Sequence, residues 1–168
     1  MSVRVPATGE QPPIRLRGHT LLCLQGFRGE GYSPGFVENL ASVHRDLRDH
    51  PDRWVLVVDE PDDVCRACPH RGPGGCTLNG EDSEDVMRAQ DRHVLERLGL
   101  QTGAKVRWRD ILDRIGVSLS GEDLPGLCGA CRWLPLGYCR EGIGSLRGQE
   151  VISIQSSVFR RKPSTEGR

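Results

Sequence analysis

The sequence predicts a small single domain of the mixed α/β (α+β) class, with a few short strands, about three to four helices and cysteine-rich loops. An alternation of apolar and basic residues at 14–17 and an apolar run at 54–58 predict the strands, and apolar residues at helical spacing predict the helices. A repeated cysteine pattern predicts the loops. The chain of 168 residues is long enough for one core but not for two, and we expect the domain to span 14–147.

The first half of the domain is predicted to contain a strand, a helix, a turn and a second helix, in that order. Residues 1–13 contain three prolines and are expected to form a flexible tail. Residues 14–17 alternate apolar and basic side chains, which predicts a strand with its arginines on a solvated face. The apolar segment 19–27 is compatible with a helix. A second helix should begin after Ser33 as N-cap and stop at Pro51.

The second half adds a strand and two helices. Residues 54–58 form a β-branched run typical of a buried strand. A helix is predicted from about 82 to 98, with acidic residues in its first turn, and a shorter helix over 108–115. Two strands separated by helices indicate a right-handed crossover. Residues 148–168 are expected to form a partly disordered extension, with a late strand at 151–154.

Composition and charge exclude several functional classes. Lys plus Arg and Asp plus Glu number 23 each, so the chain has no overall attraction for nucleic acid or anionic membranes. No run approaches the roughly 20 apolar residues needed to span a bilayer, and the N-terminus lacks the apolar core of a secretory signal. We therefore expect a cytoplasmic protein with neither nucleic-acid nor membrane partners. In that compartment seven cysteines indicate metal or thiol chemistry rather than disulfides.

Six of the seven cysteines lie in two clusters with one spacing. The first cluster is Cys65, Cys68 and Cys76 in CRACPHRGPGGC, and the second cluster is Cys128, Cys131 and Cys139 in CGACRWLPLGYC. Both segments fit the string CxACxxxxxGxC, while their flanks differ. The chain therefore uses one local motif twice. A Cys-x-x-Cys turn directs two sulfurs toward one point, which suits a tetrahedral metal or a corner of an iron–sulfur cluster.

Each cluster is one ligand short of the usual four. His19 and Cys23 are four residues apart, so on a helix they share a face. Three, three and two make eight ligands, enough for two four-coordinate sites. The preferred arrangement joins Cys23 to the first cluster and leaves the second cluster with His19 or an open position. The candidate metal ligands are Cys23, Cys65, Cys68, Cys76, Cys128, Cys131, Cys139 and His19.

Other arrangements stay open on spacing alone. The two Cys-x-x-Cys pairs could form a single site, as in zinc ribbons, although the separation between them is long for that. His70, inside the first cluster, could ligate or orient a sulfur. Spacing does not choose between zinc and iron, and the thiols could also be buried and without a metal.

The glycine-rich loop RGEGYS is a candidate substrate loop. Arg28 could hold an anion, Glu30 could act as a base, and Tyr32 lies beside them. The alternative is a tight connector whose glycines serve the backbone. The loop lacks both the Walker-A and the GxGxxG spacing, so it is not a phosphate-binding loop of those kinds.

Three segments carry a resemblance to a known family. RLRGHTLLCLQGFRGEGYS, DDVCRACPHRGPGGC and LCGACRWLPLGYC resemble the bacterial and archaeal domain of unknown function 1284 family, over about residues 14–147. The resemblance implies iron–sulfur binding, and it implies no activity and no catalytic residues. It favours iron–sulfur over zinc, which the cysteine spacing does not.

Three functions are therefore expected in order. The first is an iron–sulfur protein with one or two clusters of the 4Fe–4S type, acting in electron transfer or as a redox accessory with a redox protein partner. The second is a scaffold or interaction protein with structural zinc. The third is a metal- or cysteine-dependent enzyme, for which the sequence specifies no substrate.

Overall fold

The elements follow the predicted order, with additions near the cysteines. The computed structural model describes residues 10–129 and 131–147. The longer elements are β1 (Ile14–Arg17), α1 (Gly18–Gly26), α2 (Pro34–Asp49), β2 (Trp54–Val58), α3 (Ser83–Arg97), β5 (Lys105–Arg107), α4 (Trp108–Ser118) and α5 (Leu124–Cys128). A further helix covers residues 138–147. The predicted strand 151–154, the extension 148–168 and the tail up to residue 9 lie outside the described residues.

The main sheet has three strands in the order β1-β2-β5. β1 and β2 are parallel, with Leu16 opposite Val57, and the helices α1 and α2 form the crossover between them. β5 pairs antiparallel to β2 and was not predicted, because it is three residues long and two of them are charged. Strands and helices in one small domain confirm the mixed α/β class.

The chain after β2 returns along the outer edge of β1. The backbone N–H of Arg15 donates to Asp63 Oδ2 at 2.9 Å, and the N–H of Arg17 donates to Asp62 Oδ2 at 2.8 Å. The N–H of Asp63 donates in turn to the carbonyl of Arg15 at 3.1 Å. The loop that carries the first cluster therefore starts from a segment fixed to the sheet.

Local signals explain where the long helices begin. Ser33 Oγ accepts from the N–H of Phe36 at 3.1 Å and Pro34 follows in the first turn, as predicted for α2. Phe36, Leu40 and Leu47 form the buried face of this helix. Helix α4 begins at Trp108, as predicted, and continues three residues beyond the predicted end.

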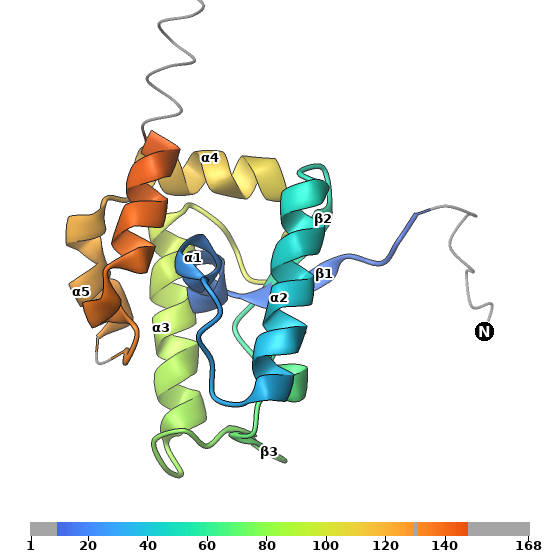
Figure 1. Ribbon diagram of the computed structural model, residues 1–168, viewed down its shortest axis with the longest axis vertical. Coiled ribbons are helices and arrows are strands. Elements are labelled where there is room, and N and C mark those ends of the chain that lie inside the picture. The colour runs from blue at the N-terminus through green and yellow to red at the C-terminus, as the bar shows by residue number, and fades with distance from the viewer. Residues whose placement is uncertain (1–9, 130, 148–168) are drawn as a thin grey trace, which may run out of the picture.

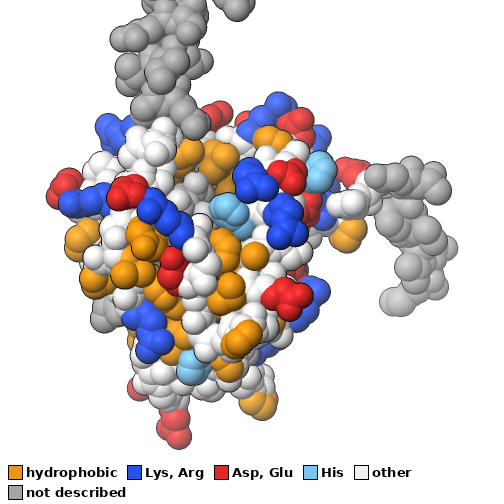
Figure 2. All heavy atoms as spheres, viewed as in Figure 1, with side chains coloured by type: hydrophobic (Ala, Val, Ile, Leu, Met, Phe, Trp, Pro, Cys, Tyr) orange, Lys and Arg blue, Asp and Glu red, His pale blue; other side chains and the backbone are white. Residues whose placement is uncertain are grey.

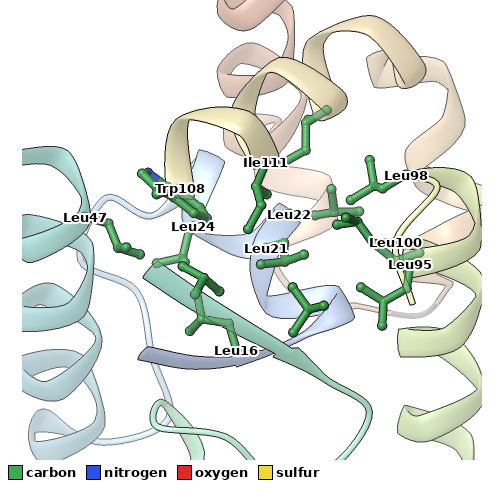
Figure 3. Close-up of a cluster of buried hydrophobic side chains, with 14 of the residues drawn as sticks. Leu16, Leu21, Leu22, Leu24, Leu47, Leu95, Leu98, Leu100, Trp108 and Ile111 are labelled. Carbon is green, nitrogen blue, oxygen red and sulfur yellow. The ribbon is translucent and has the colours of Figure 1, made fainter. Parts of the chain in front are cut away.

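The core lies between the sheet and the helices α1, α3 and α4. Figure 3 shows side chains from these elements pointing toward one another, among them Leu16 of β1, Leu21 of α1 and Ile111 of α4. All three are fully buried, which stabilises the fold by about 1.5–3 kcal/mol for each side chain. Cys68, Cys128 and Cys139 pack against the margin of this core.

The ribbon shows how the helices surround the sheet (Figure 1). Helix α1 lies in the middle of the view between α2 and α3, and α4 crosses above it. Charged side chains of both signs alternate around the same face, and hydrophobic side chains gather over its centre (Figure 2). Within residues 10–129 and 131–147, no helix is both long and apolar enough to cross a membrane.

Candidate functional site

All seven cysteines line one cavity of about 730 Å³. They come from four parts of the chain: α1, the loop after β2, α5 with the turn that follows it, and the start of helix 138–147. The predicted residues His19, Glu30 and Tyr32 line the same cavity. The structure thus brings together in one place the ligand candidates that the sequence distributes over more than a hundred residues.

The first cluster is built on a turn and a small hairpin. Cys65 begins a single 3-10 turn, and the N–H of Cys68 donates to the Cys65 carbonyl at 3.0 Å. The strands β3 (Arg71–Gly72) and β4 (Gly75–Cys76) then return the chain, which brings Cys76 back to the first two cysteines. Gly75 has φ +120°, and a Cβ there would lie 2.6 Å from Glu84, so only glycine fits.

Asp62 fixes the start of this loop. Its Oδ1 accepts from the N–H groups of Val64 and Cys65, both at 3.0 Å, while its Oδ2 accepts from the N–H of Arg17 in β1. Burial and, second to it, the charge of Asp62 raise the pKa of the Cys65 thiol to about 12. Sequence reasoning did not select Asp62, although an Asp three residues before a cysteine is a common way to hold a turn.

The second cluster repeats the turn of the first. Helix α5 ends at Cys128, and the N–H of Cys131 donates to the Cys128 carbonyl at 3.1 Å. Burial raises the pKa of the Cys128 thiol to about 12, and the neighbouring thiols of the cluster contribute. The same spacing therefore produces the same hydrogen-bonded turn in both clusters, as one local motif used twice requires.

Cys23 lies with the second cluster. Burial raises the pKa of its thiol well above the ordinary value, and the thiols that raise it next are those of the second cluster. Gly26, one turn later on α1, approaches so closely that a Cβ there would lie 2.4 Å from the Cys139 backbone nitrogen. The structure thus places Cys23 beside the second cluster and not beside the first, because helix 138–147 crosses α1 at this point. Which metal site Cys23 would join stays a prediction.

The thiols surround the cavity. Among the described residues, no three or more His, Cys, Asp or Glu side chains form a group that could hold one metal ion. All seven cysteines are free and partly exposed. The cysteines are spread over the wall of the cavity in two groups, the first cluster and the second cluster with Cys23.

A buried ion-pair network forms part of the wall. Arg17 is 1% exposed, so the expected solvated face of β1 is wrong for this residue. Its Nε donates to Asp91 Oδ2 at 2.7 Å and its Nη2 donates to Glu84 Oε1 at 2.9 Å. Glu84 Oε2 also accepts from the N–H of Cys76 at 2.8 Å, so the network reaches the first cluster. Glu84 and Asp91, seven residues apart on one face of α3, were not predicted as site residues.

His19 joins the same network. Its Nδ1 lies 2.7 Å from Asp91 Oδ1, and its backbone N–H donates to the same oxygen at 3.0 Å. The side chain is 23% exposed and lines the cavity. Asp91 therefore fixes the orientation of the ring and engages Nδ1, which leaves Nε2 for any ligand in the cavity.

Tyr32 connects the two cysteine loops. Its ring contacts that of His70 in the first loop, with centroids 4.9 Å apart, and that of Trp133 in the second, at 4.6 Å. Burial raises the pKa of the Tyr32 hydroxyl, and thiols of both clusters add to the increase. Tyr32 is thus a packing centre between the loops, and Trp133 packs against it.

The other two residues of the candidate substrate loop make local contacts. Arg28 forms an ion pair with Glu141 and lies 4.1 Å from the centroid of the Tyr138 ring, so it attaches the loop to helix 138–147. Glu30 Oε2 accepts from the N–H of Arg28 at 3.0 Å. Arg28 does not line the cavity, and a substrate role for the loop stays a prediction.

Comparison with known families identifies the chain's relatives. Residues 31–137, more than half of the chain, match the family described as Protein of unknown function (DUF1284). The chain belongs to this family. The DUF1284 match includes the first cluster and Cys128 and Cys131, whereas His19, Cys23 and Cys139 lie outside the matched residues. No curated protein and no solved structure matches the chain.

Proposed function

We propose that this DUF1284 protein binds iron–sulfur clusters in the cysteine-lined cavity and uses them for one-electron transfer. One observation carries the proposal: every cysteine of the chain, from four separate segments, lines the same cavity. Thiols that served only as small apolar side chains would have no reason to gather at one cavity.

The donor set fits an iron–sulfur group. Cysteine thiolates are the standard ligands of such clusters, and a cluster takes one thiolate at each of several irons. A cavity of about 730 Å³ exceeds what a single ion occupies, and the cysteines are spread around it. Burial raises the pKa of several of these thiols, and bound iron would favour their thiolate form.

Two features favour electron transfer over a purely structural role. The cysteines are partly exposed, so a cluster held by them lies close to the surface that a redox partner would approach. Tyr32, Leu127 and Trp133 line the same cavity and provide an apolar surrounding. Such a surrounding limits water and tunes the potential of a redox centre.

The test is the metal content of protein purified without oxygen. Iron and acid-labile sulfide in equal amounts, with a brown absorption band that dithionite bleaches, support the proposal. Colourless protein with stoichiometric zinc and no sulfide would overturn it and would favour the structural zinc function. A protein carrying seven Cys→Ser replacements is the control and should contain neither iron nor sulfide.

A further inference from the structure

We infer that the cavity holds two separate centres, one bound by Cys23 with the second cluster and one bound by His19 with the first cluster. This inference rests on the proposed function, because both centres need the cavity to bind metal. It assigns each ligand to a centre, which neither the cysteine spacing nor the family match does.

The first step is the position of Cys23 beside the second cluster, which would give that cluster a fourth thiol. Helix 138–147 crosses α1 at very close range: a Cβ on Gly142 would lie 1.9 Å from the Gln25 carbonyl oxygen, and one on Gly26 would lie 2.6 Å from Cys139 Sγ. Cys23 is three residues before Gly26 and so occupies the same face of α1. The crossing therefore directs Cys23 toward the second cluster, which then needs no histidine.

The second step is that one ring nitrogen of His19 is hydrogen-bonded and the other is free within the described part of the chain. Asp91 Oδ1 engages Nδ1 at 2.7 Å, and Asp91 is fully buried and held from its other oxygen by Arg17. A carboxylate that accepts from one ring nitrogen, with the other nitrogen directed at the metal, is the usual environment of a metal-binding histidine. Among the described residues, Nε2 has no hydrogen-bond partner, and His19 lines the cavity.

The third step connects His19 to the first cluster. From Asp91 the network passes through Arg17 to Glu84, whose Oε2 accepts from the N–H of Cys76. His19 and Cys76 are thus held by one set of buried ion pairs. Asp62 accepts from the backbone N–H groups of both Arg17 and Cys65, so this cysteine also lies beside the strand that carries Arg17.

Two other possible ligands near the first cluster lack the arrangement of His19. Both oxygens of Asp62 accept backbone N–H groups, Oδ2 from Arg17 and Oδ1 from Val64 and Cys65. The His70 ring packs edge-on against Tyr32, and no carboxylate among the described residues orients it. His70 lines the same cavity, so it serves as a matched control for His19.

The two ligand sets differ in charge. A neutral imidazole in place of a thiolate leaves the centre less negative, and histidine ligands raise the reduction potential of iron–sulfur centres. The centre of the first cluster should therefore have a higher potential than the four-thiolate centre. Two potentials in one small chain would allow an electron to pass from one centre to the other.

The experiment compares wild-type protein with His19→Cys, His19→Ala, Cys23→Ser and His70→Ala after anaerobic loading with ferrous iron and sulfide. Iron and sulfide per chain and the potential of each centre are measured, and circular dichroism checks folding. Wild-type protein should show two potentials. His19→Cys should keep the full iron content and lower only the higher potential, whereas Cys23→Ser should change only the lower one. His70→Ala should match wild type.

Three results would overturn the assignment. A single centre in loaded wild-type protein would remove the division into two. Unchanged iron content and potentials in His19→Cys and His19→Ala would show that His19 is not a ligand, with the proposed function intact. A change in His70→Ala equal to that in His19→Ala would assign the ligand to His70. Wild-type protein that takes up neither iron nor sulfide would instead overturn the proposed function itself.

Discussion

Arg17 Nε donates to Asp91 Oδ2 at 2.7 Å, and neither side chain is more than 1% exposed. The pair joins β1 to α3, 74 residues apart in the chain. Burying two charges costs free energy that only close partners and further hydrogen bonds offset. Glu84 and His19 provide those bonds. His19 lines the cavity and Glu84 accepts from the N–H of Cys76, so the stability of the fold and the shape of the site depend on the same groups.

Replacement of Arg17 by alanine should lower the free energy of unfolding by about 3–5 kcal/mol, because Asp91 and Glu84 would stay buried without their cation. Arg15, on the same strand, is 42% exposed and pairs with Glu60 at the surface. Arg15→Ala is the matched control and should cost less than about 1 kcal/mol. Urea denaturation measures both, and equal losses would contradict the buried network.

Gly26→Ala should destabilise the protein by about 1–3 kcal/mol and reduce its iron content, since the added Cβ would meet the backbone and Sγ of Cys139. Gly35, in α2, has no atom within 4 Å of the Cβ position. Gly35→Ala should be neutral or stabilise by up to about 1 kcal/mol. A Gly26→Ala protein with normal stability and iron content would argue against the close crossing of α1 and helix 138–147.

Tyr32→Ala should cost about 2–3 kcal/mol, less than the loss for a fully buried aromatic residue, because the ring is only partly buried. It should also speed the loss of the proposed clusters, since the ring joins the loops at His70 and Trp133. Tyr32→Phe keeps the ring and should change stability by less than about 0.5 kcal/mol. Thermal unfolding and the rate of bleaching in air test the two variants.

Removal of the proposed iron–sulfur clusters should loosen the cysteine loops and leave the sheet folded. The core between the sheet and α1, α3 and α4 contains many fully buried apolar side chains that do not depend on the cysteines. After treatment with ferricyanide and EDTA, hydrogen exchange should rise over 62–80, 124–129 and 131–139 and stay slow at Leu16 and Val57. Global unfolding on metal removal, as in zinc fingers, would contradict this expectation.

Asp123 should make stability depend on pH in the acid range. The N–H of Ser120 donates to Asp123 Oδ2 at 2.7 Å and Arg97 pairs with Oδ1 at 3.1 Å, which lowers the pKa of the carboxyl group. A lowered folded-state pKa gives stability that is complete above the unfolded pKa of about 3.9 and is lost as pH falls through the folded value.

In Asp123→Asn, the loss of stability between pH 7 and pH 3 should therefore be smaller than in wild-type protein. Urea denaturation at a series of pH values provides the comparison. Asp113→Asn, at an exposed carboxylate of α4 with no ion pair among the described residues, should leave the pH dependence unchanged. If the free energy of unfolding falls equally between pH 7 and pH 3 in wild-type and Asp123→Asn protein, the contacts of Asp123 with Ser120 and Arg97 do not contribute to this pH dependence.

Signals contained within a few residues predicted the local structure. The strand at 14–17, the strand at 54–58 and the cap at Ser33 were confirmed because each depends on neighbours in the chain. Helix α5 and helix 138–147 were missed, since five residues with a proline and a segment adjoining a cysteine cluster give weak helical patterns.

Long-range contacts decided the parts of the site that sequence reasoning did not predict. Arg17 was expected at the surface because its partners Glu84 and Asp91 lie on α3, more than 60 residues away. The position of Cys23 depends on how closely helix 138–147 crosses α1, which no local pattern reveals. His19 and all the cysteines line one cavity, and the sequence selects them together because two clusters that are each one ligand short require further donors. Their role as ligands stays a prediction.

The outer edge of β1 has a consequence for solubility. A strand with unpaired N–H and C=O groups is a template on which another chain can add and aggregate. In this protein the carboxylates of Asp62 and Asp63 occupy the N–H groups of Arg17 and Arg15 on that edge. The same short segment leads into the first cluster, so any event that frees the cysteine loop also uncovers the strand. Aggregation of the protein should therefore begin with opening of this segment.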